Sequence, residues 1–231
     1  MRKYFLAAAC VAFIHISSPA QISPIDTSEI SFENKLRPCL HTFYDAGARE
    51  VKAAWSDYLK RNHHIKIKGS GPFSGKEMLS ARDVIIPSIS DKRMNLFLRS
   101  SDVAGGSEVK YFMSFGYDFF IGPENFPHEF AGMKKMLKDF SKEFLIKYYA
   151  DFSTNSLKKI KGYQREIKSR NNNISKNNKK MEKASSAEIS GLEARNNALQ
   201  MDIDMLNGKI ESIRKELEGI KIKQGAIAAI Q

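Results

Sequence analysis

Residues 69–76 come nearest in this chain to a phosphate-binding loop. Such a loop has the motif Gly-x-x-x-x-Gly-Lys, followed by serine or threonine. Here Ser70 stands at the glycine position, Glu77 follows Lys76, and no convincing helix begins there. We therefore interpret the segment as a hairpin loop.

The histidines are the next residues that could do chemistry, as metal ligands. His63 and His64 are adjacent, so on a strand they would point to opposite faces and could not share one ion. His41 and His128 could join them only through tertiary contacts, and Glu129 is not part of a zinc-protease motif, which has a second histidine four residues after the first. We expect solvated or half-buried histidines, with no metal and no cofactor.

Nucleophilic catalysis has equally little support. Cys39 lies near His41 in sequence only, no Gly-x-Ser-x-Gly elbow is present, and Asp118 and Asp151 lack a paired carboxylate. We therefore predict a protein that is not an enzyme, with no catalytic residues. A cluster of His41, His128 and one of the adjacent histidines around a common point would overturn this prediction.

The clearest pattern is a coiled-coil seam near the C-terminus. Apolar residues alternate there at spacings of three and four, which is typical of heptads. Asn196 and Gln224 interrupt the seam. The arrangement of isoleucine and leucine favours a parallel dimer in the first half of the seam and a larger bundle further on, so the two halves conflict. We predict an interaction seam and expect Ile210→Asp to break self-association. The seam consists of Ile189, Leu192, Leu199, Ile203, Leu206, Ile210, Ile213, Leu217 and Ile220, and Ile227 continues it.

A break between two helical segments is expected before the seam. The apolar stripe of residues 157–181 jumps eight residues from Met181 to Ile189, so the two segments do not share one register. Ser185 and Glu188 fit a capping box, which marks a new helix start near Ala187. The alternatives are a stutter in one helix and a hairpin, and the cap favours the hairpin. A second apolar stripe, formed by Ala194, Ala198, Met201 and Met205, predicts that the helix packs between two neighbours.

The segment before these helices reads as a two-layer α+β domain over residues 28–152, with an antiparallel sheet and packed helices. A short strand is expected at residues 28–33 and a helix from an Asp45 cap to Lys60. Strands are also expected at Met94–Arg99 and from Val109 to Tyr117, where the whole face that includes Tyr117 should line the core. A long helix should begin near Pro127. Residues 21–27 read as a flexible lead, 153–185 as a basic helical segment and 186–231 as the coiled-coil helix.

Residues 1–20 have the form of a secretory signal, with Arg2 and Lys3 before an apolar run and a cleavage site after Ala20. A lipoprotein starting at Cys10 is the less favoured alternative. The apolar run is about half of the roughly 20 residues needed to span a bilayer, so we expect no membrane span after cleavage. The predicted location is the periplasm or the exterior, and the mature chain would keep Cys39 as its single thiol.

Positive charge is concentrated in residues 158–183, which hold ten basic and two acidic residues. Clustered lysines neutralise phosphates, but the export signal argues against nucleic acid, and Tyr163 is the single aromatic residue there to stack on bases. The alternatives are a weak contact with an anionic surface and a solvated helix face that keeps the protein soluble.

The sequence as a whole predicts an exported, non-enzymatic envelope protein. Its coiled coil would mediate self-association or docking to another envelope protein. The alternative is a periplasmic carrier of a small apolar or lipid-like ligand, because the domain is rich in aromatic residues that could line a cavity.

Overall fold

The computed structural model describes residues 23–67 and 78–228, so the proposed signal and the loop at residues 69–76 lie outside the described residues. The elements in chain order are β1 (Asp26–Phe32), β2 (Lys35–Tyr44), α1 (Ala48–His63), β3 (Met78–Ile86), β4 (Ser90–Val103), β5 (Gly106–Ser114), α2 (Pro127–Met181) and α3 (Ser186–Ala228). The five strands form one antiparallel sheet in the order β1-β2-β5-β4-β3.

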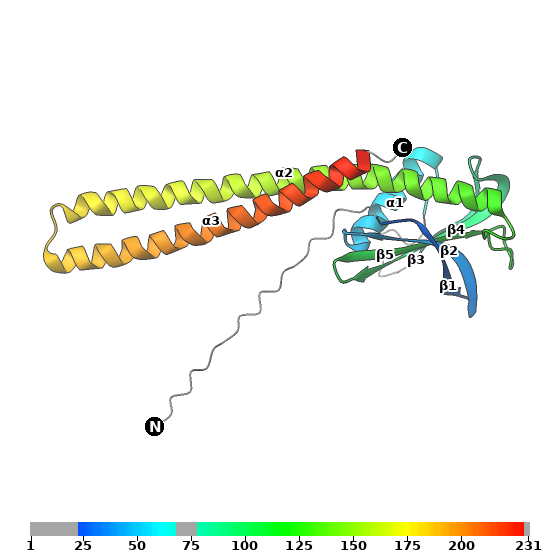
Figure 1. The fold of residues 1–231 in the computed structure, drawn as a ribbon, viewed down its shortest axis with the longest axis horizontal. Coiled ribbons are helices and arrows are strands. Elements are labelled where there is room, and N and C mark those ends of the chain that lie inside the picture. The colour runs from blue at the N-terminus through cyan, green and yellow to red at the C-terminus, as the bar shows by residue number, and fades with distance from the viewer. Residues whose placement is uncertain (1–22, 68–77, 229–231) are drawn as a thin grey trace, which may run out of the picture.

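The expected α+β architecture is confirmed. Helices α1 and α2 cover one face of the sheet, and the distal part of α2 leaves the domain and pairs with α3 as a long hairpin (Figure 1). Helix α2 has 55 residues, which corresponds to roughly 80 Å of helix at 1.5 Å per residue. It runs without interruption past residue 152, so the domain and the hairpin share one continuous helix. None of the described helices has the length and apolar character of a membrane span.

Strand β2 was missed by the sequence analysis. It follows a two-residue turn in which Glu33 and Asn34 both have positive φ, a conformation suited to tight hairpins. Both faces of the strand are buried, because Leu40 faces the helices whereas Cys39 faces the opposite side of the sheet. A strand that is buried on both faces lacks the alternation of apolar and polar residues by which strands are recognised in sequence.

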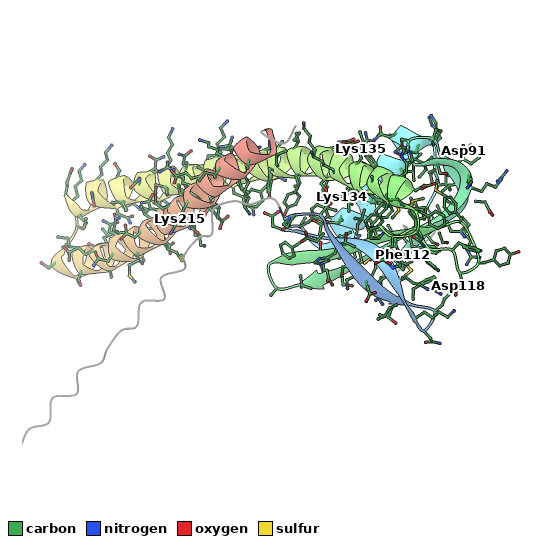
Figure 2. The ribbon with its side chains drawn as sticks, turned by 45° about the vertical axis from the view of Figure 1, so that its right-hand side comes forward. Asp91, Phe112, Asp118, Lys134, Lys135 and Lys215 are labelled. Carbon is green, nitrogen blue, oxygen red and sulfur yellow. The ribbon has the colours of Figure 1, made fainter. Side chains whose placement is uncertain are left out.

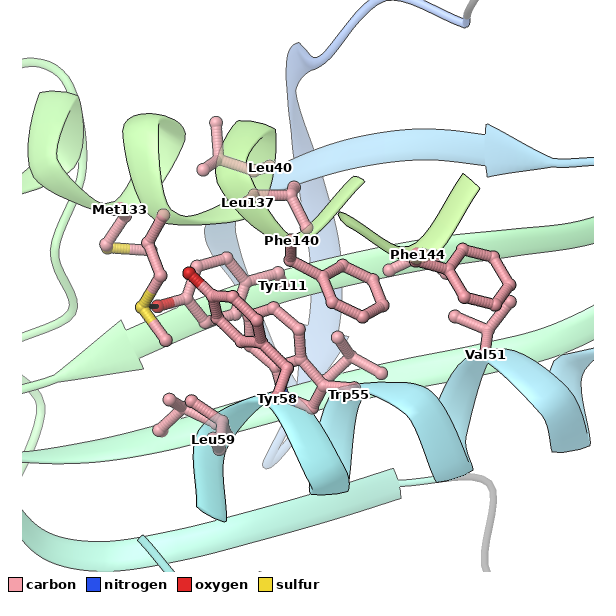
Figure 3. Close-up of a cluster of buried hydrophobic side chains, with 14 of the residues drawn as sticks. Leu40, Val51, Trp55, Tyr58, Leu59, Tyr111, Met133, Leu137, Phe140 and Phe144 are labelled. Atoms are coloured by element: carbon pink, nitrogen blue, oxygen red, sulfur yellow. Dashed lines mark hydrogen bonds between the residues drawn. The ribbon is translucent and has the colours of Figure 1, made fainter. Parts of the chain in front are cut away.

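An aromatic cluster fills the space between the sheet and the helices (Figure 3). Trp55 of α1 lies at its centre, with ring centroids 4.8 Å from Phe140 of α2 and 5.2 Å from Tyr111 of β5. Trp55 and Tyr111 are fully buried, and Phe140 is 1% exposed. This packing joins the sheet, α1 and the proximal part of α2 into one core.

A smaller cluster lies on the sheet face away from the helices. Phe32 of β1 packs on Phe97 and Phe112, with ring centroids 5.0 Å and 5.2 Å away. Cys39 is buried in the same cluster, and burial raises the pKa of its thiol to about 11. The thiol is therefore a small buried apolar group.

Two expectations about single residues were wrong. Gly47 is the N-cap of α1 in place of Asp45, and the Ala48 N–H donates to the Asp102 carboxylate of β4 at 2.7 Å. Tyr117 is 97% exposed, because β5 ends at Ser114 and the chain enters a turn in which Gly116 and Tyr117 both have positive φ.

Two buried tyrosines should respond differently to loss of the hydroxyl group. The Tyr44 hydroxyl lies 2.6 Å from the Ser141 hydroxyl, which itself donates to the Leu137 carbonyl. Within the described residues, the Tyr111 hydroxyl has as acceptors only the sulfur atoms of Met113 and Met136, which are weak. We expect Tyr44→Phe to cost about 1 kcal/mol of unfolding free energy and Tyr111→Phe to cost less than about 0.5 kcal/mol. Urea titrations of the two variants measure this difference, and an equal cost for both would contradict it.

Candidate functional site

The chain reverses between α2 and α3, which confirms the hairpin over the stutter. One of the two hydrogen bonds of the predicted capping box is present: the Ser185 N–H donates to the Glu188 carboxylate at 2.9 Å, and the Ser185 hydroxyl also donates to that carboxylate, at 2.8 Å. These two hydrogen bonds lower the pKa of Glu188. Helix α3 starts at Ser186, one residue before the expected position.

The structure places the seam residues on the face of α3 that packs against α2. Leu192, Ile203, Leu206, Ile210 and Ile220 are buried, with 4–9% of their surfaces exposed. The intervening members are half-buried, and these are Ile189, Leu199, Ile213 and Leu217. Within this structure the seam therefore packs against the chain's own α2.

Polar side chains set the register of the hairpin. Asn196, which interrupts the seam, hydrogen-bonds to Asn177 at 2.9 Å and to Asn178 at 2.7 Å on α2. Closer to the domain, the Arg170 side chain forms an ion pair with Asp202 at 3.1 Å. A polar residue in a coiled-coil seam selects the register in which it finds a partner, so these contacts specify how the two helices align.

The far end of α3 returns to the domain (Figure 1). Ile220 and Ile227 join the main hydrophobic core. The Lys223 ammonium pairs with the Asp45 carboxylate, which also accepts a 2.8 Å hydrogen bond from the Tyr149 hydroxyl. Asp45 was expected to cap α1, and instead it anchors both α2 and α3 next to the start of α1.

An exposed stripe runs along the opposite side of α3, and we call it the outer stripe. Its members repeat at spacings of four and three residues. They are small residues or methionines, and all of them are exposed in the described chain. Met201 is 73% exposed and Met205 is 53% exposed. A Cβ atom added at Gly191 or Gly208 would meet no atom within 4 Å, so the chain's own packing does not require either glycine. The outer stripe consists of Ala187, Gly191, Ala194, Ala198, Met201, Met205, Gly208 and Ser212.

The basic residues of the segment 158–183 lie on α2, except Lys183 in the turn that follows it, and most of their side chains are exposed along the hairpin. Arg170 is the half-buried exception, because it pairs with Asp202 and Glu166. Helix α3 is nearly neutral, with seven acidic and six basic residues. Lys215 is one of these basic residues, and Figure 2 shows it on α3, whereas Asp118 lies at the end of the domain remote from the hairpin tip. The two helices of the hairpin thus differ strongly in charge.

The histidines do not gather into a site. His41 lies 3.0 Å from Glu108 on the sheet, and His63 lies at the end of α1, where burial lowers its pKa. No group of three His, Cys, Asp or Glu side chains within residues 23–67 and 78–228 is arranged to hold a metal ion.

A groove between α1 and α2 was not anticipated from the sequence. Its wider part has a volume of about 490 Å³, and a narrower part of about 210 Å³ continues it along the same two helices. The two parts share Ala54, Asp57, Phe144 and Lys147. No local motif indicates this groove, because its lining residues come from two helices about 90 positions apart in the sequence.

Comparisons with known proteins give no further guide to function. The chain matches no protein-family model, no curated protein and no solved structure.

Proposed function

We propose that the protein is an exported, non-enzymatic envelope protein that self-associates through its helical hairpin. Residues 1–20 support export, since they have the three parts of a secretory signal. The observation that carries self-association is the outer stripe, where Met201 and Met205 are exposed in the middle of a regular heptad repeat. Docking of the same stripe onto a helix of another envelope protein is the alternative.

The geometry of the outer stripe suits pairing with a second copy of this chain. The stripe from Ala187 to Ser212 spans roughly 38 Å at 1.5 Å per residue, and small residues let two helices approach closely. In an antiparallel pair with a two-fold axis near residue 203, Met201 would lie beside Met205 of the second copy, and Ala198 would lie opposite Gly208. Pairing through the nearly neutral α3 keeps the two basic α2 helices apart, which limits charge repulsion.

The test is the mass of residues 21–231 by size-exclusion chromatography with light scattering. We expect a dimer that the double variant Met201→Glu/Met205→Glu converts to a monomer, because like charges would face each other across the pair. The matched control is Asn172→Glu/Asn173→Glu on exposed positions of α2, which should leave the dimer intact. A wild-type monomer at 100 μM, or equal effects of both doubles, would contradict self-association through the stripe.

The carrier function has weaker support. The aromatic side chains of the domain pack against one another between the sheet and the helices. The groove between α1 and α2 is lined by Glu50, Asp57 and Asp151, and carboxylates are poor neighbours for a lipid-like ligand. Native mass spectrometry of the purified protein tests this alternative, since a carrier would retain a bound lipid.

A further inference from the structure

The groove between α1 and α2 combines an apolar floor with an acidic rim. Phe144, Tyr148 and Phe152 form the floor and also pack on the main core, so their positions are fixed by the fold. Glu50, Asp57 and Asp151 line the groove with exposed carboxylates. Lys147 is the single basic residue of the wider part.

The carboxylates are available to a ligand. The side chains of Asp57 and Asp151 form no hydrogen bond or ion pair with any residue that the structure describes, and Glu50 bonds only to the backbone of Gly47. The charge of Glu50 acts on the floor: burial raises the pKa of Tyr148, and the charges of Glu50 and of Asp45, which lies outside the groove, raise it further. The two parts of the groove are lined by four carboxylates, which include Glu143, and by two basic side chains, Lys147 and Arg61. The groove is therefore locally negative in a chain whose formal net charge is +11.

We propose that this groove binds a peptide segment that carries both apolar and cationic side chains. Apolar side chains of the segment would cover the Phe144 and Phe152 rings, and its lysines or arginines would pair with Asp57 and Asp151. The wider and narrower parts together follow α1 from Glu50 to Arg61, roughly 16 Å at 1.5 Å per residue.

The openness of the groove favours a peptide over a small molecule. Small-ligand sites enclose most of the ligand surface, whereas the rim carboxylates here are exposed to solvent along the groove. A peptide can lie along such a surface and use several weak contacts in series. This groove lies between α1 and α2, whereas the outer stripe lies on α3, so a test of one proposal does not decide the other.

The experiment uses a fluorescein-labelled synthetic 12-residue peptide of alternating Leu-Leu and Lys-Lys pairs and the full mature chain, with fluorescence anisotropy as readout. We expect saturable binding that Asp57→Asn/Asp151→Asn weakens about three- to tenfold, because the variant loses two exposed charge pairs, each of modest strength. Lys147→Glu should strengthen binding by a few fold, since it replaces the basic residue of the wider part with a carboxylate. Met201→Glu/Met205→Glu should leave the affinity unchanged.

The matched control is Glu182→Gln/Glu193→Gln, which removes two exposed carboxylates near the turn of the hairpin. It should bind the peptide like the wild type. Absence of saturable binding, or equal weakening by the two double variants, would overturn the proposal, because the overall positive charge of the protein repels the probe and only a local site can hold it. Competition by spermine as strong as that by unlabelled peptide would overturn the choice of a peptide, because spermine has no side chains for the aromatic floor.

Discussion

Replacing Trp55 with alanine should lower the unfolding free energy by about 3–5 kcal/mol, the range found for removal of large buried aromatic side chains. Trp55 is fully buried, and its ring contacts Tyr58, Tyr111 and Phe140. These contacts come from α1, β5 and α2, so the cavity would open where the three elements meet. The neighbouring rings are held by the sheet and by both helices and cannot collapse fully into the space.

Urea unfolding followed by circular dichroism measures this loss. Trp55 is the single tryptophan of the chain, so the variant cannot be followed by tryptophan fluorescence. Phe119→Ala is the control, because Phe119 is 62% exposed and its removal should change stability by no more than about 0.5 kcal/mol. A loss below about 1 kcal/mol for the tryptophan variant would mean that the aromatic cluster is not close-packed.

Periodicity predicted the elements whose faces differ most. The helix with Val51 and Trp55 inward, and the strand with Val109, Tyr111 and Met113 inward, both bury one face against the core. Strand β5 also has a residue buried on its opposite face, Phe112, but the polar Glu108 and Lys110 keep its alternation visible. Strand β2 was missed because Cys39 and Leu40 are buried on opposite faces without such polar alternation around them. The helical segment predicted at residues 153–185 is the continuation of α2 as far as Met181, and periodicity did not reveal this continuity. Its asparagines weaken helix propensity, and the contact with α3 compensates for them.

The interaction surfaces, like the helices and strands, were predicted only where a local pattern in the sequence indicates them. The heptad spacing correctly indicated a packed helical seam, but spacing does not say whether the facing helix belongs to the same chain. The Met181 to Ile189 jump and the Ser185 cap contained that information, and the structure agrees with the hairpin they favoured. The groove between α1 and α2 could not be predicted, because it depends on how two distant helices pack on a shared sheet.

Replacing Ile210 with aspartate should open the hairpin. Ile210 is 4% exposed and lies on the α3 face that contacts α2, so the substitution removes apolar burial and puts a charge in its place. We expect the opening of α3 from α2 to become easier by about 3 kcal/mol, or roughly a hundredfold in its equilibrium constant. Amides in residues 190–215 should then exchange with solvent far faster, whereas those of β5 should keep their protection, because the domain core does not include Ile210.

Hydrogen exchange with mass spectrometry follows both regions in one sample. Asn207→Asp adds the same charge one turn away at an exposed position, and its exchange should match that of the wild type. Unchanged exchange in the Ile210 variant would contradict the packing of the seam on α2. A variant with a closed hairpin but a smaller oligomer mass would instead restore the seam as the contact between molecules, because the substitution would then act only on association and not on the fold of one chain.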